Sequence, residues 1–462
     1  MGAGKSTLGP ELATRLGRPF VSVDAVVEQR AGASVEKIFA TRGEASFREL
    51  EERAAVDALG SRIPAVNELG GGALGSAATR HALAEAAFTL LVEVTPEEAW
   101  ERVSGSGRPL ARDEAEFRAL FEERQPLYDR TADGRAADAD GAVLTAAGIH
   151  VEAGALERLE TLVPGDGPVE LVTDAHVASL HGDRARAALG DRLSAVHEVP
   201  SGEPAKSLVH AERLWSALRL DREGTLVALG GGSTVDLVGF VAATYLRGVA
   251  WAPVPTTLVG QVDAGIGGKT GVDLAEGKNL VGAFHWPARV VADPDLLETL
   301  PPEERANGLA EVVKTGLLAG EPLWELPASG QVRRCAAFKA AVCLRDPRER
   351  GERAQLNLGH TFAHALEAAS GYALPHGRAL GLGLLAALRL SGLDEQVRIV
   401  EAVLRPQLVH VDGDAAWAAL LRDKKAKDGK PRLVLLDAPG SARIGVELEP
   451  EVVRAALDAL IE

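Results

Sequence analysis

Two glycine-rich segments of the kind that binds phosphate groups lie far apart in this chain, at residues 2–7 and 230–236. Each leads into a segment in which apolar residues recur at helical spacing. Because such a loop joins a strand of a parallel sheet to the next helix, each segment needs an α/β sheet of its own. The 462 residues also exceed what one hydrophobic core usually organises. The sequence therefore predicts two or three domains, of which two are α/β.

Composition and periodicity indicate where these domains meet. Residues 131–145 are rich in Ala, Asp and Gly with little apolar pattern, which indicates a junction near residue 145. Residues 168–173 and 225–229 are typical of buried parallel strands separated by helices. From about residue 301, Leu, Val and Ala recur at helical spacing. We predict an α/β unit at 1–145, a Rossmann-like α/β unit at 146–300 and a mostly helical unit at 301–462.

Charge and cysteine content exclude several classes of partner. The net charge is −16, with 66 acidic and 50 basic side chains, which disfavours a nucleic-acid or anionic-membrane surface. Local basic clusters are therefore expected to bind small anions. Only Cys335 and Cys343 occur, so a disulfide framework is not available and a reducing cytoplasm fits best. No uninterrupted apolar span reaches the ~18 residues that a membrane helix needs.

The first glycine-rich segment, Met1-Gly2-Ala3-Gly4-Lys5-Ser6-Thr7, matches the second half of a G-x-x-x-x-G-K-[ST] loop. In such a loop backbone N–H groups surround phosphates, the lysine reaches the terminal phosphates and the serine ligates magnesium. The pattern's first glycine and the strand that feeds the loop would precede Met1, so we expect the natural chain to start upstream. The predicted nucleotide-binding residues are Gly2, Gly4, Lys5, Ser6 and Thr7, with Ser6 on Mg²⁺.

Further motifs follow this loop in a recognisable order and spacing: Asp24, Phe47-Arg48, Gly70-Gly71-Gly72, Arg108-Pro109-Leu110 and 124–128. Together they make residues 1 to about 140 resemble shikimate kinase, a P-loop kinase that uses ATP and Mg²⁺. The resemblance implies that the first parallel strand of the sheet is missing from this sequence. It also implies that shikimate is held by Asp24, Arg48, Gly70, Gly71 and Gly72, with Arg124 as a second clamp and Arg108 on a lid.

The chemistry of shikimate suits these residue types, because arginines bind its carboxylate bidentately and an aspartate can orient a hydroxyl for attack. Two positions differ from the pattern usual in the family. Ser22-Val23-Asp24 stands where Asp-x-Asp is usual, and Glu68 precedes the glycine turn where a neutral residue is common. The alternatives are that these arginines are solvated surface charges, or that the unit is a non-catalytic binding or scaffolding module.

The helical part of the chain carries a candidate metal site. Three of the eleven histidines, His360, His364 and His376, fall within 17 residues, and Glu311 lies in an earlier helical segment. Neutral histidines with a carboxylate are the ligands of catalytic zinc sites that keep an open position. His360 and His364 stand one helical turn apart, so spacing alone also permits them as a metal pair.

Residues 146–462 resemble 3-dehydroquinate synthase, a sugar-phosphate cyclase, through the motifs at 230–236, 255–257, 263–269, 308–314 and 353–364. The resemblance implies Zn²⁺ or Co²⁺ on Glu311, His360 and His376, while His364 faces the substrate. The implied NAD site comprises Gly202, Glu203, Lys206, Gly230, Gly231, Gly232, Asp236, Thr256, Thr257 and Lys278. The implied catalytic residues are Lys269, Lys314, Lys339, Arg353, Asn357 and His364. The implied further substrate ligands are Arg247, Asp263, Asn279 and one of Lys424 and Lys425.

The family's reaction would convert 3-deoxy-D-arabino-heptulosonate 7-phosphate to 3-dehydroquinate and phosphate with no net redox change. Hydride transfer to NAD creates the ketone that lets phosphate leave, and the hydride then returns. A metal-dependent polyol dehydrogenase is the main alternative, although a neutral polyol would leave Lys269 and Arg353 unpaired. Another sugar-phosphate cyclase is the closer alternative. The expected partners are small molecules, not nucleic acid or membrane, and a homodimer through the synthase part is compatible with this interpretation.

Overall fold

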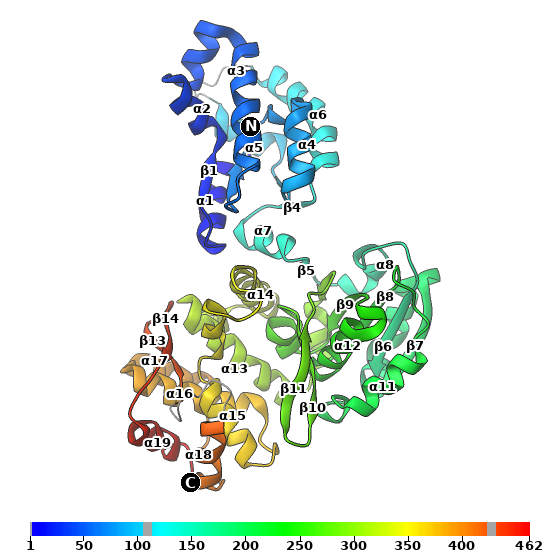
Figure 1. Cartoon of the computed structure of the whole chain (residues 1–462), viewed down its shortest axis with the longest axis vertical. Coiled ribbons are helices and arrows are strands. Elements are labelled where there is room, and N and C mark those ends of the chain that lie inside the picture. Colours follow the sequence, from blue (N-terminus) through cyan, green and yellow to red (C-terminus); the bar gives the residue numbers. More distant parts are fainter. Residues whose placement is uncertain (1, 105–112, 423–430) are drawn as a thin grey trace. The chain divides into compact units, whose positions relative to one another are not determined.

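The computed structural model describes residues 2–104, 113–422 and 431–462. The α/β class predicted from the sequence is confirmed, with parallel sheets and many helices. The chain divides into two compact units, Met1–Ala147 and Gly148–Glu462, which are described separately (Figure 1). None of the helices in the described ranges is long and apolar enough to cross a membrane.

The first unit contains short parallel strand pairs covered by helices. β1 (Phe20–Ser22) pairs with β2 (Val66–Glu68), and β3 (Leu90–Val92) pairs with β4 (Gly134–Ala136), both in parallel. Apolar side chains of α2 and α3 form a core with Val23, Ile38 and Phe47 fully or almost fully buried. The helices are α1 (Lys5–Arg15), α2 (Val23–Ala31), α3 (Val35–Leu59), α4 (Ala77–Ala86), α5 (Pro96–Val103), α6 (Glu114–Thr131) and α7 (Ala139–Ala146).

Side-chain caps explain where several of these helices begin. Ser34 accepts a hydrogen bond from the backbone of Lys37 at the start of α3. Thr95 and Glu98 form a reciprocal capping box at the start of α5. The order of strand, cap and helix therefore follows local sequence signals, and it leaves the C-terminal end of β2 beside the first turn of α1.

The second unit begins with a four-stranded parallel sheet in the order β7-β6-β8-β9. Its strands are β6 (Val169–Asp174), β7 (Leu193–Val199), β8 (Thr225–Gly230) and β9 (Ala250–Pro255). β6 and β8 occupy the two segments predicted as buried strands, and every residue in both is buried. Its helices are α8 (Leu159–Leu162), α9 (Ala175–Val177), α10 (Asp183–Leu189), α11 (Leu208–Ala217) and α12 (Gly232–Thr244).

A hairpin separates this sheet from the helical half of the unit in Figure 1. It consists of β10 (Lys269–Leu274) and β11 (Gly277–Phe284), paired antiparallel. A further parallel pair joins β12 (Val290–Ala292) to β5 (Ile149–Val151). Because β10 contacts α12 closely, the hairpin lies against the helix that follows the second glycine-rich loop.

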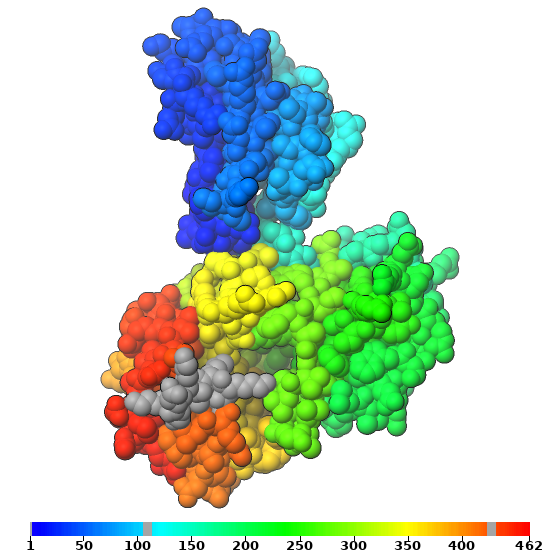
Figure 2. Space-filling view, in the orientation of Figure 1, coloured from blue at the N-terminus to red at the C-terminus, as the bar shows by residue number. Residues whose placement is uncertain are grey.

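The helical half packs around a large apolar core drawn mainly from α15 and α16. Figure 2 shows the surface of this unit passing from green on the sheet side to red over the last helices. A short antiparallel hairpin, β13 (Leu433–Ala438) and β14 (Ser441–Val446), was not predicted by the helical periodicity. The helices are α13 (Pro302–Ala319), α14 (Ala328–Arg345), α15 (His360–Ala369), α16 (His376–Ser391), α17 (Asp394–Leu404), α18 (Gly413–Arg422) and α19 (Pro450–Asp458).

Candidate active sites

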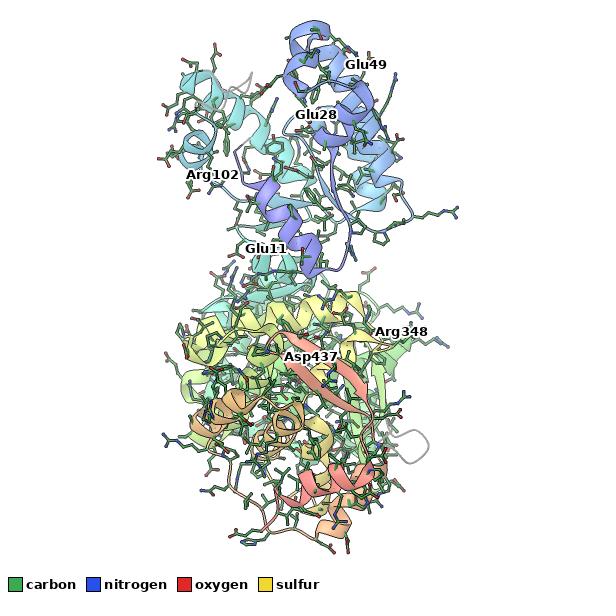
Figure 3. The ribbon with its side chains drawn as sticks, turned by 90° about the vertical axis from the view of Figure 1, so that its left-hand side faces the viewer. Glu11, Glu28, Glu49, Arg102, Arg348 and Asp437 are labelled. Atoms are coloured by element: carbon green, nitrogen blue, oxygen red, sulfur yellow. The ribbon has the colours of Figure 1, made fainter. Side chains whose placement is uncertain are left out.

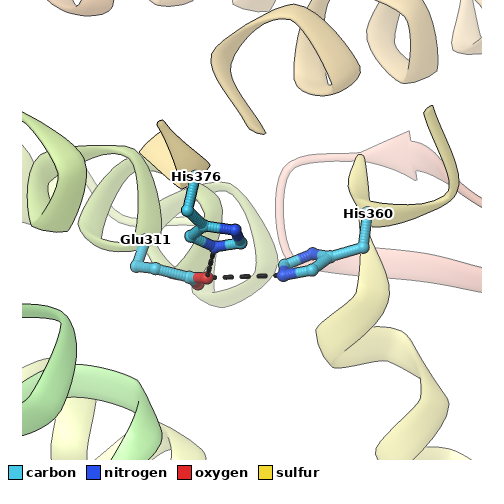
Figure 4. A group of neighbouring side chains, drawn as sticks. All are labelled: Glu311, His360 and His376. Carbon is cyan, nitrogen blue, oxygen red and sulfur yellow. Dashed lines mark hydrogen bonds and ion pairs between the residues drawn. The ribbon is translucent and has the colours of Figure 1, made fainter. Parts of the chain in front are cut away.

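Glu311, His360 and His376 come from three helices and converge on one point (Figure 4). One ligand atom of each lies within 4.8 Å of the others. Nε2 of His376 is 3.0 Å and Nε2 of His360 is 3.4 Å from the same oxygen, Oε1 of Glu311. Two imidazoles and a carboxylate match the donor set of a catalytic zinc site with an open position. The residues present therefore fit a divalent ion such as Zn²⁺ or Co²⁺.

Backbone packing fixes the helices that carry the two histidines. Gly359, in the left-handed conformation with φ 78°, precedes His360 at the start of α15. A Cβ atom on Gly383 of α16 would lie only 2.1 Å from the carbonyl oxygen of Gly359. Both positions therefore need glycine, and α15 meets α16 through main-chain atoms next to His360.

His364 lies beside this cluster but does not belong to it. Its ring centroid is 5.4 Å from that of His360, in an edge-to-face arrangement. Within the described residues, the group that brings three possible metal ligands together is Glu311, His360 and His376. The geometry thus favours the ligand set implied by the resemblance over the helical pair His360 and His364.

Neighbouring charges and burial shift the pKa values of all three residues in the cluster. Burial alone would raise the pKa of Glu311, but Lys314 and the two histidines hold it well below its usual value. Burial likewise opposes the charged form of His376, yet Glu311 and Glu367 raise its pKa to about 10. Burial and the nearby Lys314 lower the pKa of His360. Glu311 is therefore held as a carboxylate, the form that binds a metal.

Buried lysines extend the cluster toward Asp263. Nζ of Lys314 lies 2.5 Å from Oε2 of Glu311 and 3.6 Å from Oδ1 of Asp263. Nζ of Lys339 lies 2.7 Å from the same Asp263 oxygen and donates to its backbone carbonyl at 2.8 Å. The structure thus brings together Lys314, Lys339 and Asp263, which the sequence predicted as site residues, beside the three candidate metal ligands.

Arg353 is a further basic residue of the predicted site, and its side chain is almost fully buried. Its two terminal nitrogens donate to the carbonyls of Gly267 and Pro347, each at 2.9 Å. Its Nε is buried without a hydrogen-bond partner among the described residues. A buried guanidinium that keeps one donor free is suited to binding an anion.

Glu349 links two further predicted residues. It forms an ion pair with Lys269 and accepts a hydrogen bond from Nδ2 of Asn357 at 2.9 Å. Desolvation lowers the pKa of Lys269, whose side chain is half exposed, even though Glu349 opposes the shift. Sequence reasoning missed Glu349, because it stands in a run of charged residues, 345–353, from which nothing singles it out.

The second glycine-rich loop joins β8 to α12 and gathers the predicted NAD residues. Nζ of Lys206 donates to Asp236 at 2.8 Å and to Oδ1 of Asn279 at 2.6 Å. Glu203 contacts Nζ of Lys278 at 3.1 Å and accepts a hydrogen bond from Ser233 at 3.0 Å.

Close backbone approach explains the glycines of this loop. A Cβ on Gly230 would lie 2.8 Å from Thr234, and one on Gly231 would lie 3.1 Å from Thr257. The backbone N–H of Thr256 donates to the carbonyl of Gly230 at 2.9 Å, which ties β9 to the loop. Gly232 is the first residue of α12, and Gly202, with φ 72°, precedes the turn that carries Glu203. The predicted set therefore forms one edge of the sheet.

Asn279 and Arg247 were also predicted to bind the substrate. Asn279 joins the predicted NAD group through Lys206. Arg247 ends the turn that follows α12, whereas Gly232 begins this helix of 13 residues, which spans ~20 Å. Arg247 thus lies at the opposite end of α12 from the second glycine-rich loop, and its role as a substrate ligand stays a prediction. The predicted residues Lys424, Lys425 and Arg108 lie outside the described residues.

In the first unit, the glycine-rich loop leads directly into α1. Gly2 and Gly4 adopt left-handed backbone conformations, with φ 72° and 84°. The carbonyl of Gly4 accepts hydrogen bonds from the amides of Thr7 and Leu8, and Lys5 is the first helical residue. Arg102, labelled in Figure 3, donates to the carbonyl of Gly2 at 3.3 Å. A helix N-terminus behind such a loop favours bound phosphate.

The residues predicted to bind shikimate gather around the 70–72 turn. A Cβ on Gly70 would lie 3.2 Å from a carboxylate oxygen of Asp24, and one on Gly72 would lie 2.3 Å from the guanidinium of Arg48. Arg124 donates to the carbonyl of Gly71 at 3.1 Å.

Two residues of this group were missed from the sequence. Tyr128 donates to the carbonyl of Gly71 at 2.5 Å. Glu51, which is buried, contacts Arg48 at 2.6 Å. Glu51 lies three residues after Arg48 on α3, and this helical spacing is the signal that could have revealed it.

Comparison with known proteins matches both units. The shikimate kinase family matches residues 1–148, and the N-terminal and C-terminal families of 3-dehydroquinate synthase match residues 196–307 and 308–426. The 3-dehydroquinate synthase of Symbiobacterium thermophilum is 41% identical over 372 residues, which cover 74% of this chain and 99% of that protein. That of Gloeobacter violaceus is 42% identical, covering 68% and 96% of the two chains.

Solved structures agree with the fold of the second unit. 2-epi-5-epi-valiolone synthase from Streptomyces hygroscopicus, solved with NAD⁺ and Zn²⁺ bound, is 27% identical with a TM-score of 0.60. The match covers 68% of this chain and 96% of that one. A 2-deoxy-scyllo-inosose synthase, 24% identical with a TM-score of 0.62 and the same coverage, shares the fold. The chain therefore belongs to the 3-dehydroquinate synthase family and carries a shikimate kinase domain at its N-terminal end.

Proposed function

We propose that the Glu311, His360 and His376 cluster is the metal centre at which this chain converts 3-deoxy-D-arabino-heptulosonate 7-phosphate to 3-dehydroquinate and phosphate. The observation that carries the proposal is the convergence of these ligands beside the buried lysines Lys314 and Lys339. The identity of 40–42% to curated 3-dehydroquinate synthases supports the same reaction.

The cofactor sites follow from the donors present. Zn²⁺ or Co²⁺ at the cluster would supply Lewis-acid polarisation of a substrate hydroxyl, and NAD⁺ at the second glycine-rich loop would accept and return a hydride. Lys206, Asp236 and Lys278 would hold the dinucleotide there, with Gly230, Gly231 and Gly232 allowing its pyrophosphate to approach the backbone.

The remaining residues would bind the substrate's anionic groups. Arg353 keeps a buried Nε free to donate, which suits a carboxylate. Lys269, whose side chain is half exposed, has a pKa lowered by desolvation, so it gains from an anionic partner beyond Glu349. Asn357, which contacts Glu349, and His364, which lies beside His360, would bind the phosphate. Asp263 would hold Lys314 and Lys339 in place, through the contacts described above.

A polyol dehydrogenase would use a similar loop and metal site, but its uncharged substrate would leave Arg353 unpaired in a buried position. A buried Arg353 would equally suit the anionic substrate of another sugar-phosphate cyclase, so it does not exclude that reaction. The assay therefore has to identify the product rather than only detect turnover.

For the first unit we propose that Asp24, Arg48, Arg124 and the 70–72 turn hold shikimate while the 2–7 loop holds ATP. Mg²⁺ bound at Ser6 would neutralise phosphate charge during transfer. The proximity of Asp24 and Arg48 to the turn supports this arrangement. The two reactions are not consecutive, so no transfer of product between the units is expected.

The organisation of the chain and its setting are also proposals. The division into 1–145, 146–300 and 301–462 is supported by the compact units and by the start of α13 at Pro302. A cytoplasmic location is supported by two buried, unpaired cysteines. A homodimer through the synthase part is tested by sedimentation of the purified chain.

The decisive experiment supplies purified protein with the heptulosonate phosphate, catalytic NAD⁺ and Zn²⁺, and follows phosphate release together with formation of 3-dehydroquinate. We expect both to appear in equal amounts while NADH does not accumulate. Stoichiometric NADH would indicate a dehydrogenase, and a different cyclic product would indicate another cyclase. A separate assay of shikimate-dependent ADP formation tests the kinase site.

A further inference from the structure

Ser6 and Glu68 form a hydrogen bond at the mouth of the first glycine-rich loop. Oγ of Ser6 donates to Oε1 of Glu68 at 2.8 Å. Ser6 lies in the first turn of α1, and Glu68 is the last residue of β2. The two are 62 residues apart in sequence, so the contact is made by the fold rather than by a local turn.

The strand register adds a second observation. β1 and β2 are parallel, and their last residues, Ser22 and Glu68, are paired neighbours. The hydroxyl of Ser22 serves as the N-cap of α2, where it accepts from the amide of Ala25 at 3.5 Å. Ser22 therefore offers no negative charge at this edge of the sheet, whereas Glu68 does.

The other acidic side chains of this region face the 70–72 turn. Glu51 contacts Arg48, and Asp24 lies beside Gly70. Glu68 instead contacts the hydroxyl that a G-K-[ST] loop presents to magnesium. In phosphate-loop enzymes the ion is held by this hydroxyl together with an acidic residue at the end of a strand.

We propose that Glu68, together with Ser6, positions the magnesium ion of the bound nucleotide. Glu68 then supplies the negative charge that a carboxylate at position 22 would supply and that Ser22 cannot. The proposal rests on the kinase function proposed above. Mg²⁺ prefers oxygen ligands and keeps several waters, so Glu68 is suited either to bind it or to hold its water shell. The assignment also explains an acidic residue two positions before the glycine turn.

The test measures metal binding rather than turnover. Mn²⁺ replaces Mg²⁺ as the probe, and its binding to the full chain with ADP is followed by electron paramagnetic resonance. ADP affinity in EDTA is measured in parallel by calorimetry. We expect Glu68→Gln, which keeps the shape but removes the charge, to weaken Mn²⁺ binding by about tenfold or more. ADP affinity in EDTA should stay within about twofold.

Glu49→Gln is the matched control, because Glu49 is an exposed glutamate on α3 of the same unit. It should leave Mn²⁺ binding unchanged. The double variant Glu68→Gln with Ser22→Asp moves the carboxylate to the paired position on β1 and should recover most of the lost Mn²⁺ affinity. Unchanged synthase activity in each variant, with unchanged circular dichroism, shows that the chain is folded.

Several results would overturn the proposal. Equal Mn²⁺ affinity for Glu68→Gln and wild type would make Glu68 a surface hydrogen-bond partner only. An equal loss of ADP affinity in EDTA would show that it merely shapes the loop. No recovery in the double variant would show that the two positions do not serve the same ion. If the wild type itself binds no Mn²⁺ with ADP, the kinase proposal fails as well. If the wild type binds Mn²⁺ and the variants give one of the results above, only the proposal for Glu68 fails.

Discussion

Glu367 lies 2.9 Å from Nδ1 of His376, on the opposite side of the ring from Glu311. A carboxylate at this position accepts a hydrogen bond from Nδ1–H and thereby directs the Nε2 lone pair toward a metal. Since Glu367 is itself buried, it has little freedom to turn away. Its position is set by α15, which also begins with His360.

We expect Glu367→Ala to weaken metal binding by about 10- to 100-fold, as loss of such a partner typically does. Glu367→Gln should fall between this variant and the wild type, because its amide oxygen still accepts the hydrogen bond without the charge. Competition for Zn²⁺ with a chromophoric chelator measures the affinities. Equal affinities in all three proteins would show that Glu367 does not orient His376.

The histidine pair on α15 provides a direct comparison. His360→Ala should remove bound metal and synthase activity together, because it deletes one of the converging ligands. His364→Ala should retain the metal while lowering turnover. Metal analysis of the purified variants decides the matter, and loss of zinc from both would restore the helical pair as the ligand set.

Gly72→Ala should impair the kinase site alone. The added Cβ would lie 2.3–2.5 Å from the guanidinium atoms of Arg48, so the arginine has to move while the backbone, with φ −105°, is not strained. We expect KM for shikimate to rise by about tenfold or more, the cost of misplacing one charge-assisted contact. Synthase activity and thermal stability should not change.

Gly75→Ala is the matched control, because a Cβ there meets nothing within 4 Å. It should leave KM for shikimate as in the wild type. If both variants behave alike, Arg48 is not a shikimate ligand or the turn is more tolerant than its packing indicates.

His181 makes the stability of the second unit depend on pH. The side chain is buried, and burial followed by the charge of Arg184 lowers its pKa below the ordinary value of 6.5. Its Nδ1 lies 3.4 Å from Arg184, which favours the neutral ring. The unfolded chain therefore binds more protons than the folded chain just below pH 6.5.

The stabilising contribution of His181 is complete above pH 6.5 and is lost as the pH falls toward the folded-state pKa. We expect the melting temperature of the wild type to fall more steeply than that of His181→Gln over this range. Differential scanning calorimetry of the full chain from neutral to mildly acidic pH measures both. Parallel pH profiles would contradict the assignment.

Short sequence motifs were enough to predict the candidate metal ligands. They were not enough to predict contacts between side chains that only folding brings together. Glu311 and the histidines could be found because few other reasons place such donors in an apolar helical region. Asn279 could not be placed, because its left-handed backbone, φ 53°, turns it toward Lys206.

Contacts between segments were likewise hidden. Glu349 meets Asn357 and Lys269 only because the turn after α14 approaches β10. The β13 and β14 hairpin was missed since its apolar run, 433–436, is too short to separate from helical periodicity. Such features depend on tertiary packing, which local sequence patterns do not determine.

The contact between Gly359 and Gly383 fixes how the two helices that carry the histidines pack. Main-chain atoms have no rotamers, so the two helices cannot slide apart or together by repacking side chains. The backbone at the start of α15 is therefore held at a nearly fixed distance from α16, the helix that begins with His376. An ion of another radius has to be accommodated by rotation of the two imidazole rings and by the reach of Glu311, while the main chain that carries them stays in place.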